Sequence, residues 1–287
     1  MTWTSDRPAE EAPISLLGWL RVAVRGLCLA ALVFGGLFVL LALRLAERPL
    51  FGLRRPWTPY ITQFVCRGAF YILGIKHETE GAQMTTAGAI VANHSSWLDI
   101  FALNARKRVY FVSKSEVASW PGIGWLARAT GTVFIRRDPR DAKIQQDIFE
   151  ARLLVGHKLL FFPEGTSTDG LRLLPFKPTL FQAFFADPLR ERLAVQPVTV
   201  VYEAPKGEED RFYGWWGDMA FGPHLLKTLS APRGGEVRIK YHRPLAVADF
   251  QDRKALAKAA EVAVRDGLPK EKLTAGKAYD KALGPLS

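Results

Sequence analysis

The feature that most constrains this chain is an uninterrupted run of uncharged, mostly apolar residues near its beginning. Residues 26–43 carry no charge over 18 positions, and Arg25 and Arg44 border the run. This length is at the lower limit for a helix that crosses a bilayer, and it exceeds the apolar part of an ordinary signal peptide. Arg44 and Glu47 stand where a cleavage site of small residues would be needed. The sequence therefore predicts an uncleaved membrane anchor, which either crosses the membrane or lies in it.

A second apolar segment follows, and arginines flank the first run on both sides. Residues 57–74 are rich in aromatic side chains but contain Arg67, which favours a helix lying in the membrane interface. Two arginines (21, 25) precede the first run and four (44, 48, 54, 55) follow it. Because cytoplasmic segments carry the excess of positive charge, the C-terminal body is expected to face the cytoplasm. Residues 1–80 are thus predicted to dock the chain on the inner, cytoplasmic membrane.

The charge balance indicates an anionic partner. The chain has 39 Lys and Arg against 28 Asp and Glu, a formal charge of +11, and a pI of about 9.8. Nucleic acid and anionic lipid both suit this charge, but the 48% hydrophobic content, with 18 Phe and 8 Trp, favours membrane lipids over nucleic acid. The two cysteines form no closely spaced pair, and no metal site is predicted.

Beyond residue 88, short β-branched or aromatic runs alternate with helical patterns. Strands are predicted at residues 89–92, 109–113, 132–135, 158–162, 195–202 and 236–241, and a helix at 141–155 that ends at Gly156. A long excursion, 203–235, separates the last two strands and is expected to be a lid or a membrane-facing loop. A surface helix is followed by a weakly ordered tail after residue 265. The pattern predicts an α/β domain at 81–250 with a mixed, largely parallel sheet flanked by helices, and a C-terminal helix and tail at 251–287.

A histidine and an aspartate follow the first predicted strand of this domain. His94 comes just after the strand, and Asp99 is five residues later in the pattern NHSSWLD. On one continuous helix these two side chains would point about 140° apart. His94 must therefore lie in the turn, where Asp99 can accept a hydrogen bond from one ring nitrogen and leave the other as a general base. Ser96-x-x-Asp99 is also a capping-box pattern that needs no catalytic role, and this reading stays open.

Two further patterns lie at predicted strand ends. Glu164, Gly165 and Thr166 follow an apolar strand, and their turn can hold a hydroxyl or a polar headgroup, or it can be a tight turn with a solvated Glu. Arg136 and Arg137 end another strand and can clamp a phosphate or carboxylate, although such pairs are often solvated.

The remaining pattern is a proline within a predicted strand. Pro197 lies in the β-rich run LAVQPVTVVY. Because proline has no N–H to donate to a sheet ladder, it indicates an edge strand or a bulge near a site.

Together, the order and spacing of these patterns resemble the glycerolipid acyltransferase family, typified by the 1-acylglycerol-3-phosphate acyltransferases. The resemblance covers residues 89–202. The matching positions are His94 and Asp99 for the His-x4-Asp block, Arg137 for the Phe-Ile-x-Arg block, residues 162–166 for the Phe-Pro-Glu-Gly-Thr block, and Pro197 for the last block.

The resemblance implies a direct acyl transfer. His94, oriented by Asp99, would deprotonate the hydroxyl of a lysolipid acceptor, which attacks the thioester of acyl-carrier protein or acyl-CoA. The thioester is a co-substrate and no cofactor is implied. Membrane lipids, the lysolipid and the carrier are then the expected partners.

The sequence departs from the family pattern at one position. The family often has arginine after Glu-Gly-Thr, where it is thought to meet the acceptor phosphate, but this chain has Ser167. The stretch FPEGTSTDGLRLLPFK is more similar to the branch that acylates lyso-ornithine lipid. Both acceptors, lyso-ornithine lipid and 1-acylglycerol-3-phosphate, remain open at this point.

Two other classes of protein are compatible with parts of the sequence. A non-catalytic, basic membrane-surface protein would share the charge and the aromatic content. A serine hydrolase of lipids would need an activated serine, yet no G-x-S-x-G pattern surrounds any serine in the chain. Thioester consumption that depends on a lysolipid would separate the transferase from both.

Overall fold

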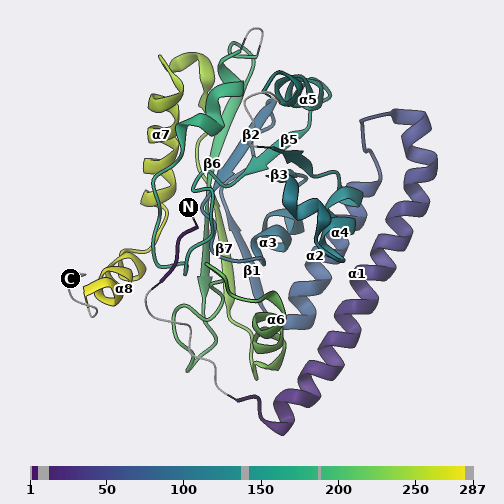
Figure 1. Ribbon diagram of the computed structural model, residues 1–287, viewed down its shortest axis with the longest axis vertical. Helices are drawn as coiled ribbons and strands as arrows, with labels where there is room; N and C mark the ends of the chain where they lie inside the picture. Colours follow the sequence, from purple (N-terminus) through teal and green to yellow (C-terminus); the bar gives the residue numbers. More distant parts are fainter. Residues whose placement is uncertain (1, 6–12, 137–141, 187–188, 282–287) are drawn as a thin grey trace.

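The structure of the protein is a computed structural model that describes residues 2–5, 13–136, 142–186 and 189–281 (Figure 1). The helices are α1 (Leu16–Phe51), α2 (Thr58–Leu73), α3 (Asp99–Arg106), α4 (Ile123–Thr130), α5 (Ala142–Leu154), α6 (Phe221–Ser230), α7 (Arg253–Asp266) and α8 (Lys270–Lys281). The strands are β1 (Lys76–Glu80), β2 (Gly88–Ala92), β3 (Tyr110–Lys114), β4 (Val133–Ile135), β5 (Lys158–Phe161), β6 (Ala194–Glu203), β7 (Glu236–Tyr241) and β8 (Leu245–Ala246). Short 3₁₀ helices occupy Ser115–Ser119, Pro178–Phe185 and Val247–Asp249.

The strands form one mixed, largely parallel sheet, which confirms the predicted fold class. Their order is β1-β7-β6-β2-β5-β3-β4, and β8 pairs with β6 beside this path. Strand β2 lies between two parallel partners, with Val91 level with Phe161 of β5 and Pro197 of β6. Strand β7 runs antiparallel to β6. The carboxyl ends of β2 and β5 therefore meet at one edge, where ligands commonly bind in open α/β sheets.

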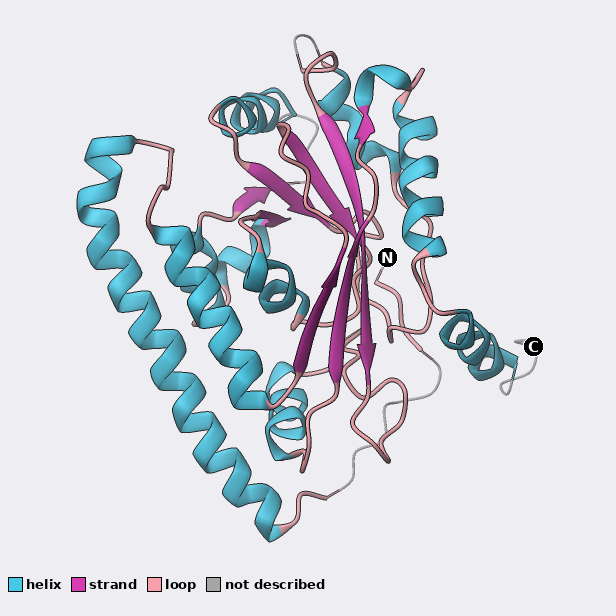
Figure 2. Cartoon of the chain, turned by 180° about the vertical axis from the view of Figure 1, so that it is seen from behind, coloured by secondary structure: helices cyan, strands magenta, loops and turns pink. Residues whose placement is uncertain are grey.

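Alternating side chains of the central strands fill two cores, one on each face of the sheet. Helices cover both faces (Figure 2). In β2, Ile90 packs on one face with α2, α3 and α6, whereas Val91 packs on the other with α7 and the 3₁₀ helix Pro178–Phe185. This follows from the two-residue period of a strand, since successive side chains point to opposite faces. Both faces are buried, which explains why β2 is apolar throughout.

The prediction that Pro197 marks an edge strand is wrong. Strand β6 is an interior strand, with β2 on one side and β7 and β8 on the other. On the latter side, β8 pairs only with residues 194 and 195, and β7 begins to pair at Val198. Pro197 lies in the gap between them, where no ladder N–H is required, and its carbonyl accepts from His242 N–H at 3.0 Å. The Gln196 side chain bridges the same gap, donating to Ala82 O and His242 O at 2.8 Å each.

Helix α1 is the one described helix that is long and apolar enough to cross a membrane. Its 36 residues correspond to about 54 Å at 1.5 Å per residue, well beyond a hydrocarbon core of about 30 Å. Only 6% of its most apolar window is buried. Exposed apolar side chains continue on α2, including Phe64 and Tyr71, so the two helices present a large apolar surface.

Helix α1 contacts the domain near both of its ends. Near the first end, Arg21 Nε donates to Ser230 O at 2.8 Å, and Arg25 Nη1 donates to Leu229 O at 3.0 Å. These carbonyls belong to the last turn of α6, which has no helical N–H for them. Near the other end, the buried carboxylate of Glu47 accepts from Thr58 N–H at 3.0 Å and so caps the start of α2.

Strand β1 and helix α8 are among the elements that the sequence did not predict. Strand β1 is a run of five polar residues, KHETE, yet it pairs in parallel with β7 at the end of the sheet. Strand β1 lies inside residues 1–80, the segment that was predicted to dock on the membrane. The boundary of that segment at residue 80 stays a prediction. Helix α8 forms over residues 270–281, where a weakly ordered tail was expected, and its buried Lys272 pairs with Glu203 at 3.2 Å. The strands predicted at residues 89–92, 195–202 and 236–241 and the helix at 141–155 are confirmed within two residues at each end.

Candidate active site

The catalytic candidate lies in a turn that the end of β2 holds firmly. Asn93 directly follows β2, and its side-chain amide bonds the backbone of β6 in both directions, with Val200 N–H donating to Oδ1 and Nδ2 donating to Val200 O, each at 2.8 Å. The amide thus continues the sheet for one residue after the strand has ended. The next residue, His94, can then turn out of the sheet without leaving an unpaired edge.

The His94 ring lies against Asp99 as the sequence predicts. The distance from Nδ1 to Asp99 Oδ2 is 2.7 Å, and the same oxygen accepts the N–H groups of Ser95 at 2.9 Å and Ser96 at 3.1 Å. Asp99 is fully buried, whereas 20% of the His94 side chain is exposed. The carboxylate therefore fixes Nδ1 as the donor, and Nε2, which bonds none of the described residues, carries the lone pair.

An aromatic ring fixes the plane of the imidazole. The rings of His94 and Phe162 stack at 3.9 Å between centroids, with 9° between their planes. Phe162 follows β5, the parallel neighbour of β2, so the two strands bring the pair together at one edge of the sheet. Stacking on one face and a hydrogen bond at Nδ1 leave the ring little freedom to rotate.

Glu164 acts on the main chain of this turn. Its side chain is 1% exposed, and its two oxygens accept the N–H groups of His94 and Leu174 at 2.8 Å each. The alternative of a solvated Glu is therefore wrong. Burial raises the pKa of Glu164 to about 8, although the two N–H donors act in the opposite direction. Glu164 positions the backbone of His94 from the neighbouring strand end.

The raised pKa of Glu164 predicts a pH-dependent stability. In the unfolded chain the group ionises near pH 4.5, but in the folded chain it ionises near pH 8. Its contribution to stability is therefore complete below about pH 4.5 and is lost as the pH rises to about 8. Urea unfolding in detergent should show that the free energy of unfolding of the wild type decreases from pH 5 to pH 8. The decrease should be smaller for Glu164→Gln. Equal decreases would show that Glu164 does not titrate in this range.

A lysine that the sequence analysis did not single out lies over the Glu-Gly-Thr turn. Gly165 has φ +74°, and a Cβ placed there would lie 2.6 Å from Lys177 Nζ. The backbone of Lys177 is tied to this turn, since its N–H donates to Pro163 O at 3.0 Å. The contact brings a cation to the turn from 12 residues further along the chain, a distance at which sequence spacing carries no signal.

Thr166 lies against residues 2–5, a short described segment near the middle of the molecule (Figure 1). Its Oγ1 accepts Trp3 N–H at 3.4 Å. The Trp3 ring lies 4.6 Å from the guanidinium carbon of Arg172, and Arg172 forms a bidentate pair with the buried Asp169 at 3.0 Å and 3.0 Å. Arg172 is the first arginine after Ser167, and its charge is therefore neutralised by the carboxylate of Asp169.

Of the two arginines predicted to clamp a headgroup, the structure describes Arg136 alone. Arg136 follows β4, the outermost strand, and is exposed at the same edge of the sheet as His94. Three strand spacings separate β4 from β2, about 14 Å at about 4.8 Å each. Arg137 lies outside the described residues.

Other neighbours of the site come from the segment that was expected to be a lid or a membrane-facing loop. Trp215 N–H donates to Ser95 O at 2.8 Å, and Trp216 is 5% exposed. This segment is packed beside the catalytic turn. Tyr202 at the end of β6 is also near, because burial and then the charge of Asp99 raise the pKa of its hydroxyl. In the sequence, the aromatic residues of these segments do not by themselves indicate that they contact the catalytic turn.

Comparison with known proteins agrees with this architecture. The sequence profile of the Acyltransferase family matches residues 75–201. A lyso-ornithine lipid O-acyltransferase from Rhodobacter capsulatus is 58% identical over 93% of this chain and 96% of its own length. A lyso-ornithine lipid O-acyltransferase from Brucella abortus is 36% identical over 74% of this chain and 83% of its own length.

A solved structure shares the fold. The 1-acyl-sn-glycerophosphate acyltransferase PlsC from Thermotoga maritima superposes with a TM-score of 0.59, at 21% identity, over 95% of this chain and 97% of that protein. The family profile and the curated relatives show that this α/β protein is an acyltransferase. The chain belongs to the acyltransferase family, and it is a lysolipid acyltransferase.

Proposed function

We propose that the protein transfers a fatty acyl group from an acyl thioester to the free hydroxyl of lyso-ornithine lipid. His94 Nε2 takes the proton of the acceptor hydroxyl, and the hydroxyl oxygen forms an ester bond with the thioester carbonyl carbon as the carbon–sulfur bond breaks. The proton on His94 then passes to the departing thiolate, so the base is regenerated and no covalent enzyme intermediate forms. The buried Asp99 stabilises the imidazolium that exists between the two proton transfers.

The hydrogen bond between His94 Nδ1 and Asp99 carries this proposal. At 2.7 Å from a fully buried carboxylate, Nδ1 is the protonated nitrogen and Nε2 is the basic one. Nε2 lies at the carboxyl edge of the sheet, where 20% of the His94 side chain is exposed and an acceptor hydroxyl can approach. Both carboxylates in the turn have structural partners, so His94 is the group that supplies the base.

The acceptor is inferred from the cations around the Glu-Gly-Thr turn. Ser167 has no charge, and Arg172 is already paired with Asp169. Lys177 brings one cation over Gly165. One cation suits the single carboxylate of an amino-acid headgroup better than the two charges of a phosphate monoester. The names of the relatives from Rhodobacter and Brucella support the same choice, and 1-acylglycerol-3-phosphate is the second candidate, for which Arg136 and Arg137 would supply the charge.

The donor is proposed to be acyl-carrier protein or CoA carrying the acyl chain, acting as co-substrate without a further cofactor. The formal charge of +11 supports an acidic carrier, because opposite charge speeds the encounter of two proteins. Nucleic acid is not a proposed partner.

The catalytic domain is proposed to lie on the cytoplasmic side of the inner membrane. Since α1 bonds α6 near one end and caps α2 near the other, a perpendicular crossing would draw the domain into the hydrocarbon. A position along the interface, with the apolar side of α1 and α2 in the lipid, is compatible with these contacts. It also keeps a single-chain lipid within reach of the site.

A panel of acceptors tests the proposal. Purified full-length protein would receive lyso-ornithine lipid or lysophosphatidic acid with each donor, while free thiol and acylated product are measured. We expect thiol release that depends on acceptor, with higher kcat/KM for lyso-ornithine lipid. Free fatty acid without acceptor would indicate a hydrolase, and the absence of turnover with every pair would indicate a binding protein.

A further inference from the structure

A hollow of about 720 Å³ lies at the edge of the sheet opposite to His94. It is bordered by the end of α1, the connection to α2, the end of α3 and the starts of β3 and β5 (Figure 1). Lys158, which begins β5, lines it, whereas Glu164 follows the other end of that strand. Six residue steps of about 3.3 Å separate the two, about 20 Å along the chain. The hollow is therefore distinct from the proposed acyl-transfer site.

The described residues that line the hollow include many cations and no acid. The cationic lining residues are Arg54, Arg55, Arg106, Lys107, Arg108 and Lys158. They come from three different parts of the chain, so no single helix or loop accounts for the cluster. The carboxylate of Glu47 acts on Arg55, but its oxygens are bonded to Trp57, Thr58 and Arg44. Among the described residues, no carboxylate lines the hollow to balance its positive charge.

Several buried donors face the hollow without a partner among the described residues. His157 is 6% exposed, and neither of its ring nitrogens forms a hydrogen bond. Gln83 Nε2 and Arg55 Nε, also in the lining, are buried and unpaired. A buried polar atom without a partner costs about 1–3 kcal/mol, so natural proteins retain such groups where a ligand or water completes them.

The pKa values agree with this crowding of positive charge. Burial, followed by Arg152, Arg55 and Arg44, lowers the pKa of His157 to about 3. Burial and Arg44 likewise lower the pKa of Arg55 to about 10. His157 is therefore neutral at pH 7 and can donate one hydrogen bond without adding charge. Its ring stacks on Tyr110 at 4.0 Å between centroids, which holds it in place.

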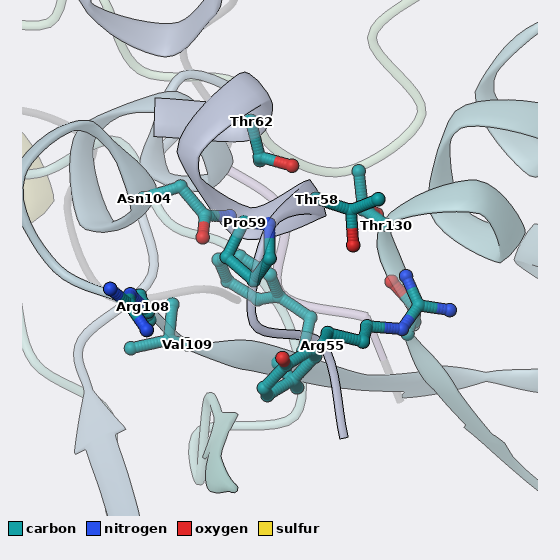
Figure 3. Close-up of a pocket in the computed structure, with 11 residues that line it drawn as sticks. Arg55, Thr58, Pro59, Thr62, Asn104, Arg108, Val109 and Thr130 are labelled. Atoms are coloured by element: carbon teal, nitrogen blue, oxygen red, sulfur yellow. The ribbon is translucent and has the colours of Figure 1, made fainter. Parts of the chain in front are cut away.

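A narrower pocket adjoins the hollow and shares Arg55, Arg108 and Tyr110 with it (Figure 3). Its volume is about 10 Å³, enough for one water at most. Figure 3 shows Arg55 and Arg108 on opposite sides of the first turn of α2, near Pro59. An anionic group must therefore sit in the outer hollow, which Arg55 and Arg108 also line.

We propose that this hollow binds the phosphate group of a membrane lipid headgroup, at a site separate from the acyl-transfer centre. Phosphate is the anion that a cluster of arginines with neutral donors recognises best. The lipid source is favoured because Phe51, which lines the hollow, is 41% exposed and packs edge-on against the exposed Trp57 at 5.1 Å. These rings continue the apolar surface of α1 and α2, so the hollow opens where lipid headgroups lie.

Charge-removal variants of the full-length protein test this proposal. Arg106→Gln/Lys107→Gln removes two charges of the hollow, that of the exposed Arg106 and that of the half-buried Lys107, and Lys206→Gln/Lys254→Gln removes two exposed charges elsewhere as the control. Flotation with phosphatidylcholine vesicles, with and without phosphatidylglycerol, measures the lipid arm. Thermal unfolding in inorganic phosphate against chloride at equal ionic strength measures the free-phosphate arm.

We expect phosphatidylglycerol to strengthen vesicle binding of the wild type and the control. For the hollow variant, the increase in vesicle affinity that phosphatidylglycerol causes should be about 10- to 30-fold smaller. Each basic residue near an anionic surface contributes about five-fold to that affinity. His157→Phe keeps the ring stacked on Tyr110 but removes both nitrogens, and it should weaken the same binding without a change of charge. Equal losses in the two paired variants, or wild-type binding by His157→Phe, would overturn a built site.

The two arms separate the sources of the phosphate group. Stabilisation of the wild type by inorganic phosphate that the hollow variant loses, without any response to phosphatidylglycerol, would keep the phosphate site but exclude the lipid source. No dependence of either arm on the hollow residues would overturn the proposal. Because acyl transfer is not the readout, these results are independent of the acceptor and of His94.

Discussion

Replacing His94 with alanine is expected to lower the rate of acyl transfer by about 10²- to 10⁴-fold while the protein stays folded and membrane-bound. Loss of a general base typically has an effect of this size. The fold should survive, because 20% of the side chain is exposed and its neighbours Asn93 and Glu164 bond the main chain. Thiol release and product formation with lyso-ornithine lipid would measure the effect.

His242→Ala is a matched control for this variant. The His242 ring bonds the Thr199 hydroxyl at 2.8 Å under α7, so its removal tests the loss of an imidazole away from the catalytic turn. We expect near wild-type turnover from it. Wild-type turnover by His94→Ala itself would eliminate the mechanism, whatever the behaviour of the control.

Asp99→Asn should be milder than His94→Ala. Ser95 and Ser96 N–H both point to the carboxylate oxygen that also accepts from His94 Nδ1. These two donors would orient the oxygen of an amide in the same direction, so His94 would keep its tautomer and lose only the charge beside it. A charge-assisted hydrogen bond exceeds a neutral one by about 1 to 1.5 kcal/mol, or about 10-fold in rate.

Replacing Ser167 with arginine is expected to shift acceptor preference toward lysophosphatidic acid. The ratio of kcat/KM for the phosphate acceptor over lyso-ornithine lipid should rise about 10- to 150-fold at most. This corresponds to a change of about 1.5 to 3 kcal/mol in the difference between the two activation free energies. Asp169 would not neutralise the new guanidinium, because Arg172 already occupies both of its oxygens. Competition between the two acceptors in one vesicle preparation gives the ratio directly.

A second arginine variant separates this local effect from a general gain of charge. Gln251→Arg adds the same charge at an exposed position just before α7 and should leave the ratio unchanged. An unchanged ratio in Ser167→Arg, or a wild type that acylates lysophosphatidic acid and ignores lyso-ornithine lipid, would show that Ser167 does not determine the acceptor.

The sequence predicted those parts of the site that local spacing determines. His94 and Asp99 are five residues apart in one turn, and the strand-end position of Glu164 follows from the apolar run before it. Contacts between distant segments were beyond reach. Neither the cover of Gly165 by Lys177 nor the stacking of Phe162 on His94 has a sequence period. The first contact depends on how the loop after β5 folds back, and the second on how β2 and β5 lie side by side.

The wrong predictions have related causes. Pro197 resembles an edge residue because one sequence does not reveal where neighbouring strands stop, and here β7 and β8 leave a gap at that position. Strand β1 was missed because its KHETE sequence has no alternation of apolar and polar residues. Helix α8 was missed because its Lys- and Ala-rich sequence has too few apolar residues to indicate a buried face. In each case tertiary pairing decided the structure.

The clamped turn after β2 has an energetic consequence for each catalytic cycle. Asn93 ties it to β6, Glu164 holds the His94 N–H, Thr168 N–H donates to His94 O at 2.9 Å, and Asp99 holds the ring. Fixing a backbone residue and its side chain costs about 1–2 kcal/mol or more in entropy. Here that ordering occurs once, when the chain folds, so binding of the lipid has no loop to immobilise and more of the binding energy remains for lowering the reaction barrier.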